Sequence, residues 1–134
     1  MAVDPTAFIL DTSAYSGFNR GDERLLPWFN PKFNIFIPLI VIGELRAGFA
    51  AGSKTAENER LLARFLDSAS VQILPLTLGT TKMFAKIFQQ ARATGTAVGS
   101  NDLWIAALAM ENNLPLLTLD EDFQRLEDVQ VVEV

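Results

Sequence analysis

The sequence contains no cysteine and no histidine. Without cysteine there can be no disulfide, thiol nucleophile or thiolate zinc site. Without histidine there is no Ser-His-Asp triad, no imidazole general base and no imidazole metal ligand. Any catalysis must therefore use carboxylates, hydroxyls, Lys, Arg, Tyr or a metal ion held by oxygen atoms. Such hard ligands favour magnesium or manganese.

Long apolar runs and a basic leader are also missing. The longest apolar run, 35–43, is interrupted by Pro38 and is far shorter than the roughly 20 residues that a membrane-spanning helix needs. The N-terminus carries Asp4 and no basic residue, which is unlike a secretory signal. We therefore expect a cytoplasmic protein that does not contact membranes. Its 134 residues, 49% of them hydrophobic, fit one folded domain over 1–134.

Short apolar segments alternate with amphipathic ones along the whole chain. The pattern predicts strands and helices in turn, which implies βαβ units and a mostly parallel sheet with helices on both faces. We expect a three-layer α/β/α domain. The predicted strands are 7–10, 33–37, 71–74, 114–118 and 129–132; the predicted helices are a short one after Asp11 capped by Thr12 or Ser13, then 23–29, 39–51, 55–66, 77–93, 100–112 and a turn over 120–126, with a loop turn at 17–21.

Several acids stand where open α/β sheets bind ligands. Asp11 and Asp120 directly follow predicted strands, and Asp102 lies in the first turn of a predicted helix. Each of these three could simply be a helix cap. Glu44 could not, because it lies mid-helix with apolar or small residues at its helical neighbours. Since parallel strands end at one edge of a sheet, we expect these acids to meet there.

Converging carboxylates without basic partners in their own motifs repel one another. A bound divalent cation removes that repulsion, and it can activate water and polarise a phosphate. The net charge of −5 argues against a simple electrostatic nucleic-acid binder. However, Asp11, Glu44, Asp102, Asp120 and Asp122 together carry five negative charges, so the rest of the chain is neutral. The acidity does not exclude a nucleic-acid substrate.

Four segments resemble, in order, the four acidic motifs of PIN-domain ribonucleases. They are Asp11-Thr12-Ser13, then 43–48 (GELRAG), 101–107 (NDLWIAA) and 118–123 (TLDEDF). The resemblance covers essentially the whole chain, and the length is that of VapC-type toxins of toxin–antitoxin pairs. A single motif of this kind has little specificity, whereas the four together in order are fairly specific.

The resemblance implies RNA cleavage that depends on magnesium or manganese. Asp11, Glu44 and Asp102 match the three core acids of the family. Asp120 and Asp122 both fit the fourth position, and we expect both to lie in the site, with Asp120 among the catalytic acids.

Polar residues beside the acids have expected supporting roles. Thr12 or Ser13 matches a hydroxyl position that orders water or phosphate, and Asn101 adjoins Asp102. The family often has Ser or Thr shortly before the glutamate, where this chain has Pro38-Leu39. Four cations are candidates for phosphate contact, with solvated surface charge as the alternative: Arg20, Arg24, Arg46 and Lys54.

The resemblance also implies partners. VapC-type toxins usually form homodimers and are neutralised by a VapB-type antitoxin, whose peptide can place an arginine among the acids. Charge supports this, because an acidic pocket accepts a guanidinium. The ten Phe residues fit dimer and antitoxin surfaces or ordinary core packing. Trp28 and Trp104 fit base stacking or the core in the same way.

Three other functions compete with a toxin ribonuclease. A PIN nuclease of housekeeping RNA processing is not separable by sequence from a toxin. A catalytically silent PIN-like binding module conflicts with the complete acid set. Other acid-site α/β proteins fit poorly, since a haloacid dehalogenase phosphatase needs an acid where Ser13 stands and a receiver domain needs a lysine that 116–119 lacks. There is also no Gly-rich phosphate loop.

Overall fold

The computed structural model describes residues 5–134 and contains a parallel four-stranded sheet of order β3-β2-β1-β4. The strands are β1 (Ala7–Leu10), β2 (Asn34–Pro38), β3 (Val71–Leu74) and β4 (Leu116–Leu117). The chain moves outward from β1 to β3 and then crosses to the opposite side of β1 for β4. The strand order therefore reverses at β1, and such a switch point is where open α/β sheets bind ligands.

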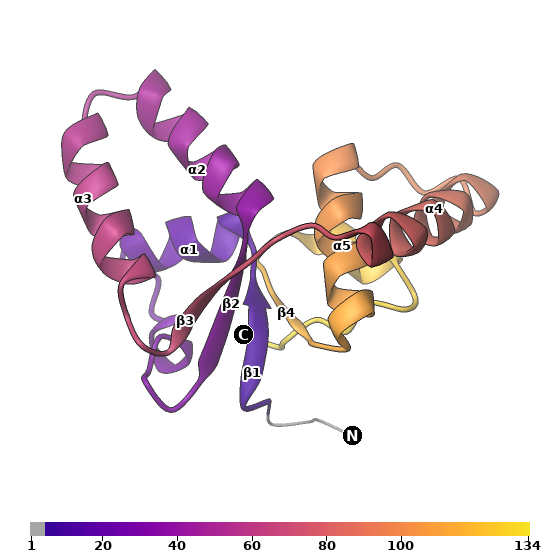
Figure 1. The fold of residues 1–134 in the computed structure, drawn as a ribbon, viewed down its shortest axis with the longest axis horizontal. Helices are drawn as coiled ribbons and strands as arrows, with labels where there is room; N and C mark the ends of the chain where they lie inside the picture. Colours follow the sequence, from indigo (N-terminus) through magenta and orange to yellow (C-terminus); the bar gives the residue numbers. More distant parts are fainter. Residues whose placement is uncertain (1–4) are drawn as a thin grey trace.

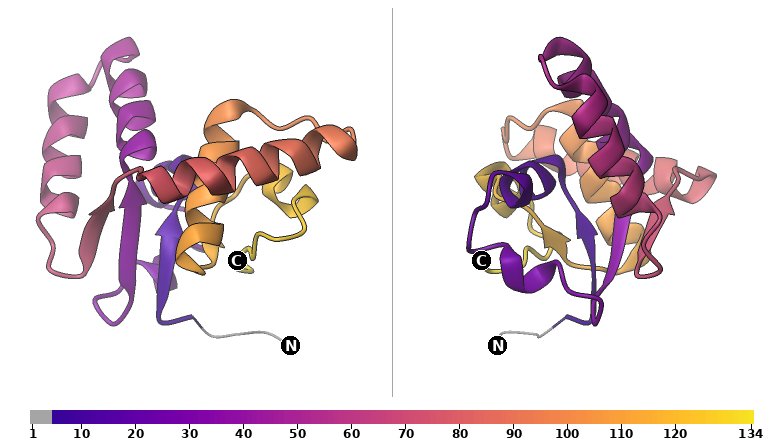
Figure 2. Two further views of the ribbon diagram at one scale, coloured as in Figure 1. Left: turned by 45° about the vertical axis from the view of Figure 1, so that its right-hand side comes forward. Right: turned by 90° about the vertical axis from the view of Figure 1, so that its left-hand side faces the viewer.

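Helices cover both faces of the sheet, as predicted for a three-layer α/β/α fold (Figures 1 and 2). They are α1 (Thr12–Asn19), α2 (Leu39–Ala51), α3 (Thr55–Leu66), α4 (Leu78–Ala93) and α5 (Ser100–Asn112). Short 3-10 helices follow at η1 (Leu26–Trp28) and η2 (Glu121–Arg125). Figure 1 shows the α2–α3 pair rising above the carboxyl edge of the sheet, level with the start of α5.

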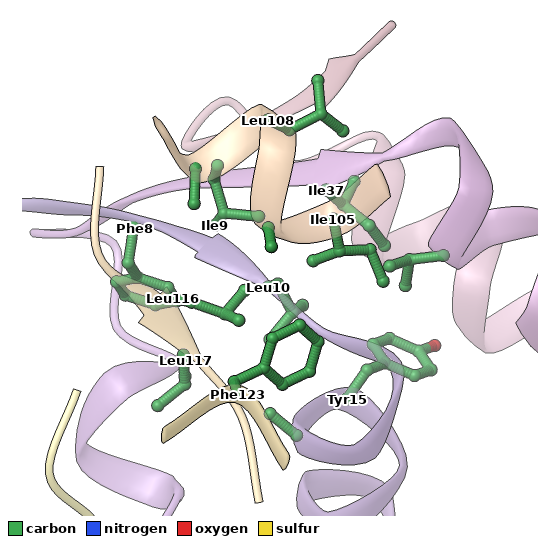
Figure 3. Packing of buried hydrophobic residues seen from close by; sticks show 14 of the residues in the cluster. Phe8, Ile9, Leu10, Tyr15, Ile37, Ile105, Leu108, Leu116, Leu117 and Phe123 are labelled. Atoms are coloured by element: carbon green, nitrogen blue, oxygen red, sulfur yellow. The ribbon is translucent and has the colours of Figure 1, made fainter. Parts of the chain in front are cut away.

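The core lies on both sides of β1 because its side chains alternate between the two faces. Phe8, Ile9 and Leu10 are fully buried. In Figure 3, Ile9 lies towards α5, whereas Leu10 lies towards Tyr15 and Phe123 on the other face. A strand buried on both faces has a continuous apolar sequence rather than an alternating one, as β1 does. In residues 5–134 no helix combines the length and apolarity needed to cross a bilayer.

Two predictions in the first quarter of the chain are wrong. The helix predicted over 23–29 is only the 3-10 turn η1, because Pro27 within it provides no backbone donor. The turn predicted over 17–21 is confined to its end, since α1 continues to Asn19 and Gly21 takes a positive φ of 85°. Gly17 lies inside α1, where a Cβ would come within 2.8 Å of a Leu25 methyl carbon and 2.9 Å of one on Leu119. This glycine therefore allows close packing rather than a turn.

Strands predicted near the C-terminus are shorter in the structure. The strand predicted over 114–118 is reduced to Leu116–Leu117, and 129–132 forms only one parallel bridge, between Val131 and Leu116. Two backbone hydrogen bonds hold that bridge, at 2.8 and 2.9 Å. Apolar alternation indicates burial at this edge, but it does not determine how long the ladder runs. The other predicted helices and strands agree to within one residue, with Thr77 as the N-cap of α4.

Candidate metal centre

Asp11 lies at the end of β1, in the N-cap position of α1, and its side chain is 4% exposed. One carboxylate oxygen, Oδ2, accepts hydrogen bonds from the Thr118 hydroxyl at 2.6 Å and the Ser13 hydroxyl at 2.9 Å. The other oxygen accepts none from residues 5–134. Asp11 makes no side-chain capping bond to α1. Its carboxylate is therefore held through one oxygen, with the second free for a ligand.

The contact between Asp11 and Thr118 follows from the sheet register. Leu10 pairs with Leu117 across β1 and β4, so the next residue of each strand lies side by side. Thr118 is buried and accepts the Asp120 backbone N–H at 3.0 Å, while Ser13 accepts the Leu119 N–H at 2.9 Å. Two hydroxyls thus connect the first acidic motif to the backbone of the fourth. The sequence did not predict this role of Thr118; its only signal is a hydroxyl two residues before Asp120 at a strand end.

Glu44 lies on α2 and is half-buried. The Thr12 hydroxyl donates to its Oε1 at 2.9 Å. Thr12 and Ser13 were predicted to cap α1, which is wrong, because both lie inside the first turn of that helix and donate to acids instead. Glu44 therefore receives a hydroxyl hydrogen bond from α1, although Pro38-Leu39 stand where the family often has Ser or Thr.

Asp102 lies in the first turn of α5, whose N-cap is Gly99. Its pKa is raised to about 6, first by burial and then by the negative charges of Asp11, Asp120, Glu44 and Asp122, in that order. Because the negative charges of four other acids disfavour the ionised form of Asp102, all four must lie near it. The five predicted acids are therefore brought to one place by segments that are far apart in the chain.

Asp120 and Asp122 lie at η2. Asp120 caps this turn by accepting the Asp122 N–H on Oδ1 at 2.9 Å. Carboxylate oxygens of Asp102, Asp120 and Asp122 lie within 4.8 Å of one another. Arg125, just beyond the fourth motif, approaches Asp122 at 3.5 Å, and both side chains are more than 40% exposed. The sequence did not predict this partner, which neutralises Asp122 in part.

Four cations were predicted to contact phosphate. Within the described residues, none of them forms an ion pair with any of the five acids. Arg24 binds Asp22 at 2.7 Å, and Arg46 binds Glu59 at 3.2 Å, linking α2 to α3. The Arg24 guanidinium holds the pKa of Asp22 below its usual value. Arg20, Lys54 and Asn101 are exposed. A contact of any of them with RNA remains a prediction.

The donor set fits a hard divalent cation. Every ligand atom offered is a carboxylate oxygen, the chemistry that magnesium, manganese and calcium prefer. Within residues 5–134 the only ion pair to any of the five acids is the exposed one at Asp122. Burial raises the pKa of Asp102 first, and the negative charges of the other four acids add to it, which a bound cation would offset.

Comparison with known proteins agrees with this geometry. A family model described as PIN domain matches residues 8–129. The chain belongs to the PIN-domain family. This PIN domain is 32% identical over 137 residues to ribonuclease VapC5 of Mycobacterium tuberculosis, covering 100% of this chain and 98% of that protein.

Solved structures show the same fold. The crystal structure of VapBC-5 from Mycobacterium tuberculosis, a member of the VapBC family of toxin–antitoxin systems, matches with a TM-score of 0.75 and 30% identity, covering 97% of this PIN domain and 100% of that chain. DNA-bound VapBC from Salmonella typhimurium matches with a TM-score of 0.81 at 22% identity, covering 93% and 96%. The second likeness supports the fold alone.

Proposed function

We propose that this protein is a metal-dependent endoribonuclease and the toxin of a toxin–antitoxin pair. The observation that carries the proposal is the convergence of five carboxylates at the switch point of a PIN-type sheet, with Asp102 in the field of the other four. Its relative over the full chain is named a ribonuclease. A catalytically silent module would have no need to maintain five mutually repelling acids.

We assign the metal to Asp11, Glu44, Asp102 and Asp120, with magnesium or manganese as the ion. When bound, such an ion lowers the pKa of a coordinated water and neutralises charge on a phosphodiester. Asp11 presents its free oxygen because Thr118 and Ser13 occupy the other. Thr12 orients Glu44 in the same way. The side chains are therefore held in place before any ligand arrives.

Asp120 and Asp122 play different parts in this scheme. Asp120 is oriented by its capping bond, which uses one oxygen and leaves the other for a ligand. The Asp122 side chain is 41% exposed and is approached by Arg125, so we assign it a contact through water. Replacing Asp120 with Asn is then more damaging to metal affinity than replacing Asp122.

The nuclease assignment is tested on purified protein with end-labelled single-stranded RNA. We expect cleavage with magnesium or manganese, none with excess chelator, and none for Asp102→Asn. The matched control is Glu121→Gln, which removes an exposed acid of η2 outside the proposed ligand set. Cleavage by the Asp102→Asn protein at the wild-type rate would overturn the scheme.

The toxin assignment needs a test in cells, because a housekeeping nuclease would pass the test in solution. The neighbouring structure from Mycobacterium tuberculosis belongs to a toxin–antitoxin system, and the acidic site suits an arginine-bearing partner peptide. We expect growth arrest on expression, abolished by Asp11→Asn and relieved by the product of an adjacent short gene. Normal growth with active enzyme present would favour the housekeeping role.

A further inference from the structure

A row of aromatic side chains lies between α4 and α5, away from the carboxylates. Trp104 of α5 stacks on Phe84 of α4 with ring centroids 3.8 Å apart and planes 21° apart. Phe84 is followed one turn later by Phe88, at 6.0 Å and 24°. The guanidinium carbon of Arg92 lies 6.0 Å from the Phe88 ring centroid. Three rings and a guanidinium thus form one series with roughly parallel rings.

The outer end of this series is open. Phe88 is 42% exposed, which is high for a phenylalanine in a folded protein. A hollow of about 650 Å³ lies beside it, lined by Phe84, Ala85, Phe88, Gln89, Arg92 and Ala93. It offers flat apolar rings, one amide and one guanidinium, which are the groups that stack on a nucleobase, bond its edge and neutralise a phosphate.

The hollow is lined by one cation, Arg92, and by no acid, although the chain as a whole is negative. Between Asp67 and Asp102 there is no acidic residue, although the net charge of the protein is −5. Arg92 lines the hollow and makes no ion pair within residues 5–134. Lys82 and Lys86 also lie on α4 but are not in the lining, and Lys86 lines a separate hollow together with Asp128. Two acids reach α4 from elsewhere, but Glu111 contacts its first turn and Asp128 contacts Gln90.

The hollow and the carboxylates are joined by α5. Asp102 lies in the first turn of that helix, and Trp104 comes two residues later. Two residues correspond to about 200° of helical rotation, so the two side chains leave opposite flanks of α5 at nearly the same height. Ser100 and Asn101 at the start of α5 are exposed, so a bound strand has access to this end of the helix.

We propose that this hollow binds unpaired bases of the RNA that is cut at the carboxylates. The inference rests on the proposed nuclease function and adds a base-binding subsite to it. A second copy of the chain is the competing occupant of an exposed aromatic face. The Gln89 amide, the Arg92 guanidinium and the absence of acids from the lining favour RNA, because these groups bond a base edge and a phosphate.

The test measures binding of a short unstructured RNA by fluorescence anisotropy, in an Asp102→Asn background that does not cut it. We expect Phe88→Ala and Phe88→Leu each to weaken binding about tenfold, since one stacked base is lost, and Phe88→Tyr to retain it. The leucine variant keeps the apolar surface and loses only the flat ring. The matched control is Leu78→Ala, a more exposed apolar residue of α4 outside the hollow, which should leave binding unchanged.

Each outcome bears on a defined claim. If wild-type protein cuts RNA but all Phe88 variants bind it equally well, the base-binding inference is wrong and the nuclease proposal stands. If Phe88→Ala leaves RNA affinity unchanged and shifts a dimer to a monomer in analytical ultracentrifugation, the face is an interface between copies. If the wild-type protein neither binds nor cuts RNA, the nuclease proposal fails, and the inference fails with it.

Discussion

Asp102 is the acid on which the charges of the site act together. Burial and four neighbouring carboxylates raise its pKa to about 6, so in the absence of a cation its ionised form opposes folding. The pKa of Asp102 is higher in the folded protein than its ordinary value of 3.8. Its contribution to folding stability is therefore fully present at a pH below 3.8. This contribution is lost as the pH rises through 6.

The substitution Asp102→Asn should therefore stabilise the metal-free protein at pH 7. One pKa unit is worth about 1.4 kcal/mol, and solvent screening of this half-buried group reduces the expected gain to about 1 kcal/mol. Urea unfolding in chelator checks this, with a gain at pH 7 that shrinks towards pH 4. Equal stability of the two proteins at pH 7 would show that the repulsion is weak.

Thr118 is expected to position Asp11 for the metal. Thr118→Val leaves the Asp120 N–H without its acceptor and Asp11 without its shorter hydrogen bond, at a cost of about 1–2 kcal/mol in unfolding free energy. Manganese affinity measured by calorimetry should fall as well, and Thr118→Ser should restore both. If the valine variant loses stability but binds manganese as tightly as wild type, Thr118 has only a structural role.

Residue type, position at strand ends and the resemblance to PIN motifs pointed to the acids, but not to the side chains that hydrogen-bond to them. With cysteine and histidine absent, a cluster of Asp and Glu at strand ends is most simply accounted for by a metal held through oxygen. Thr118 and the Thr12–Glu44 bond could not be predicted, because they depend on the register of β1 against β4 and on the rotation of α1 against α2. Arg125 was missed because a charge one helical turn from Asp122 is equally typical of solvated surface.

At the scale of elements, the strongly periodic helices were predicted well, whereas the strands at the β4 edge of the sheet were not. The bounds of α2, α3 and α5 agree with the pattern because each continues until a capping or turn residue. The lengths of β4 and of the strand predicted over 129–132 were overestimated. The number of residues that pair depends on the neighbouring strand, which the local sequence does not specify. Pro27 should have ruled out a regular helix over 23–29.

The start of α4 is tied to α5 by a half-buried carboxylate. Glu111 of α5 accepts the hydroxyls of Thr77 at 2.9 Å and Thr80 at 2.5 Å, and Thr80 is fully buried. Glu111→Ala should lower the free energy of unfolding by about 1–3 kcal/mol, because a buried hydroxyl loses its acceptor. Since Glu111 lies outside the acid cluster, metal affinity should not change.

The comparison for Glu111 is Glu127→Ala, which removes an exposed acid from another part of the surface. Urea denaturation of both variants, followed by calorimetry with manganese, separates the two effects. Unchanged stability of Glu111→Ala would mean that the contact contributes nothing net, and reduced manganese affinity would mean that α5 transmits the change to Asp102.

At the scale of the whole molecule, topology explains why four distant motifs form one site. The strand order reverses at β1, so the ends of β1 and β4 flank the switch point, β2 leads into α2 beside it, and α5 begins at the same edge (Figure 1). Local sequence provides each acid, and the crossover of the chain brings them together. The overall charge of −5 is then concentrated at this edge, while the stretch between Asp67 and Asp102 is basic.

The most direct test of the metal centre is anomalous diffraction from a crystal soaked in manganese. We predict a peak within bonding distance of carboxylate oxygens of Asp11, Glu44, Asp102 and Asp120, absent from crystals of Asp102→Asn grown and soaked in the same way. An ordered site without a peak at saturating manganese, or a peak that persists in the Asp102→Asn crystals at full height, would contradict the claim that these acids form one metal centre.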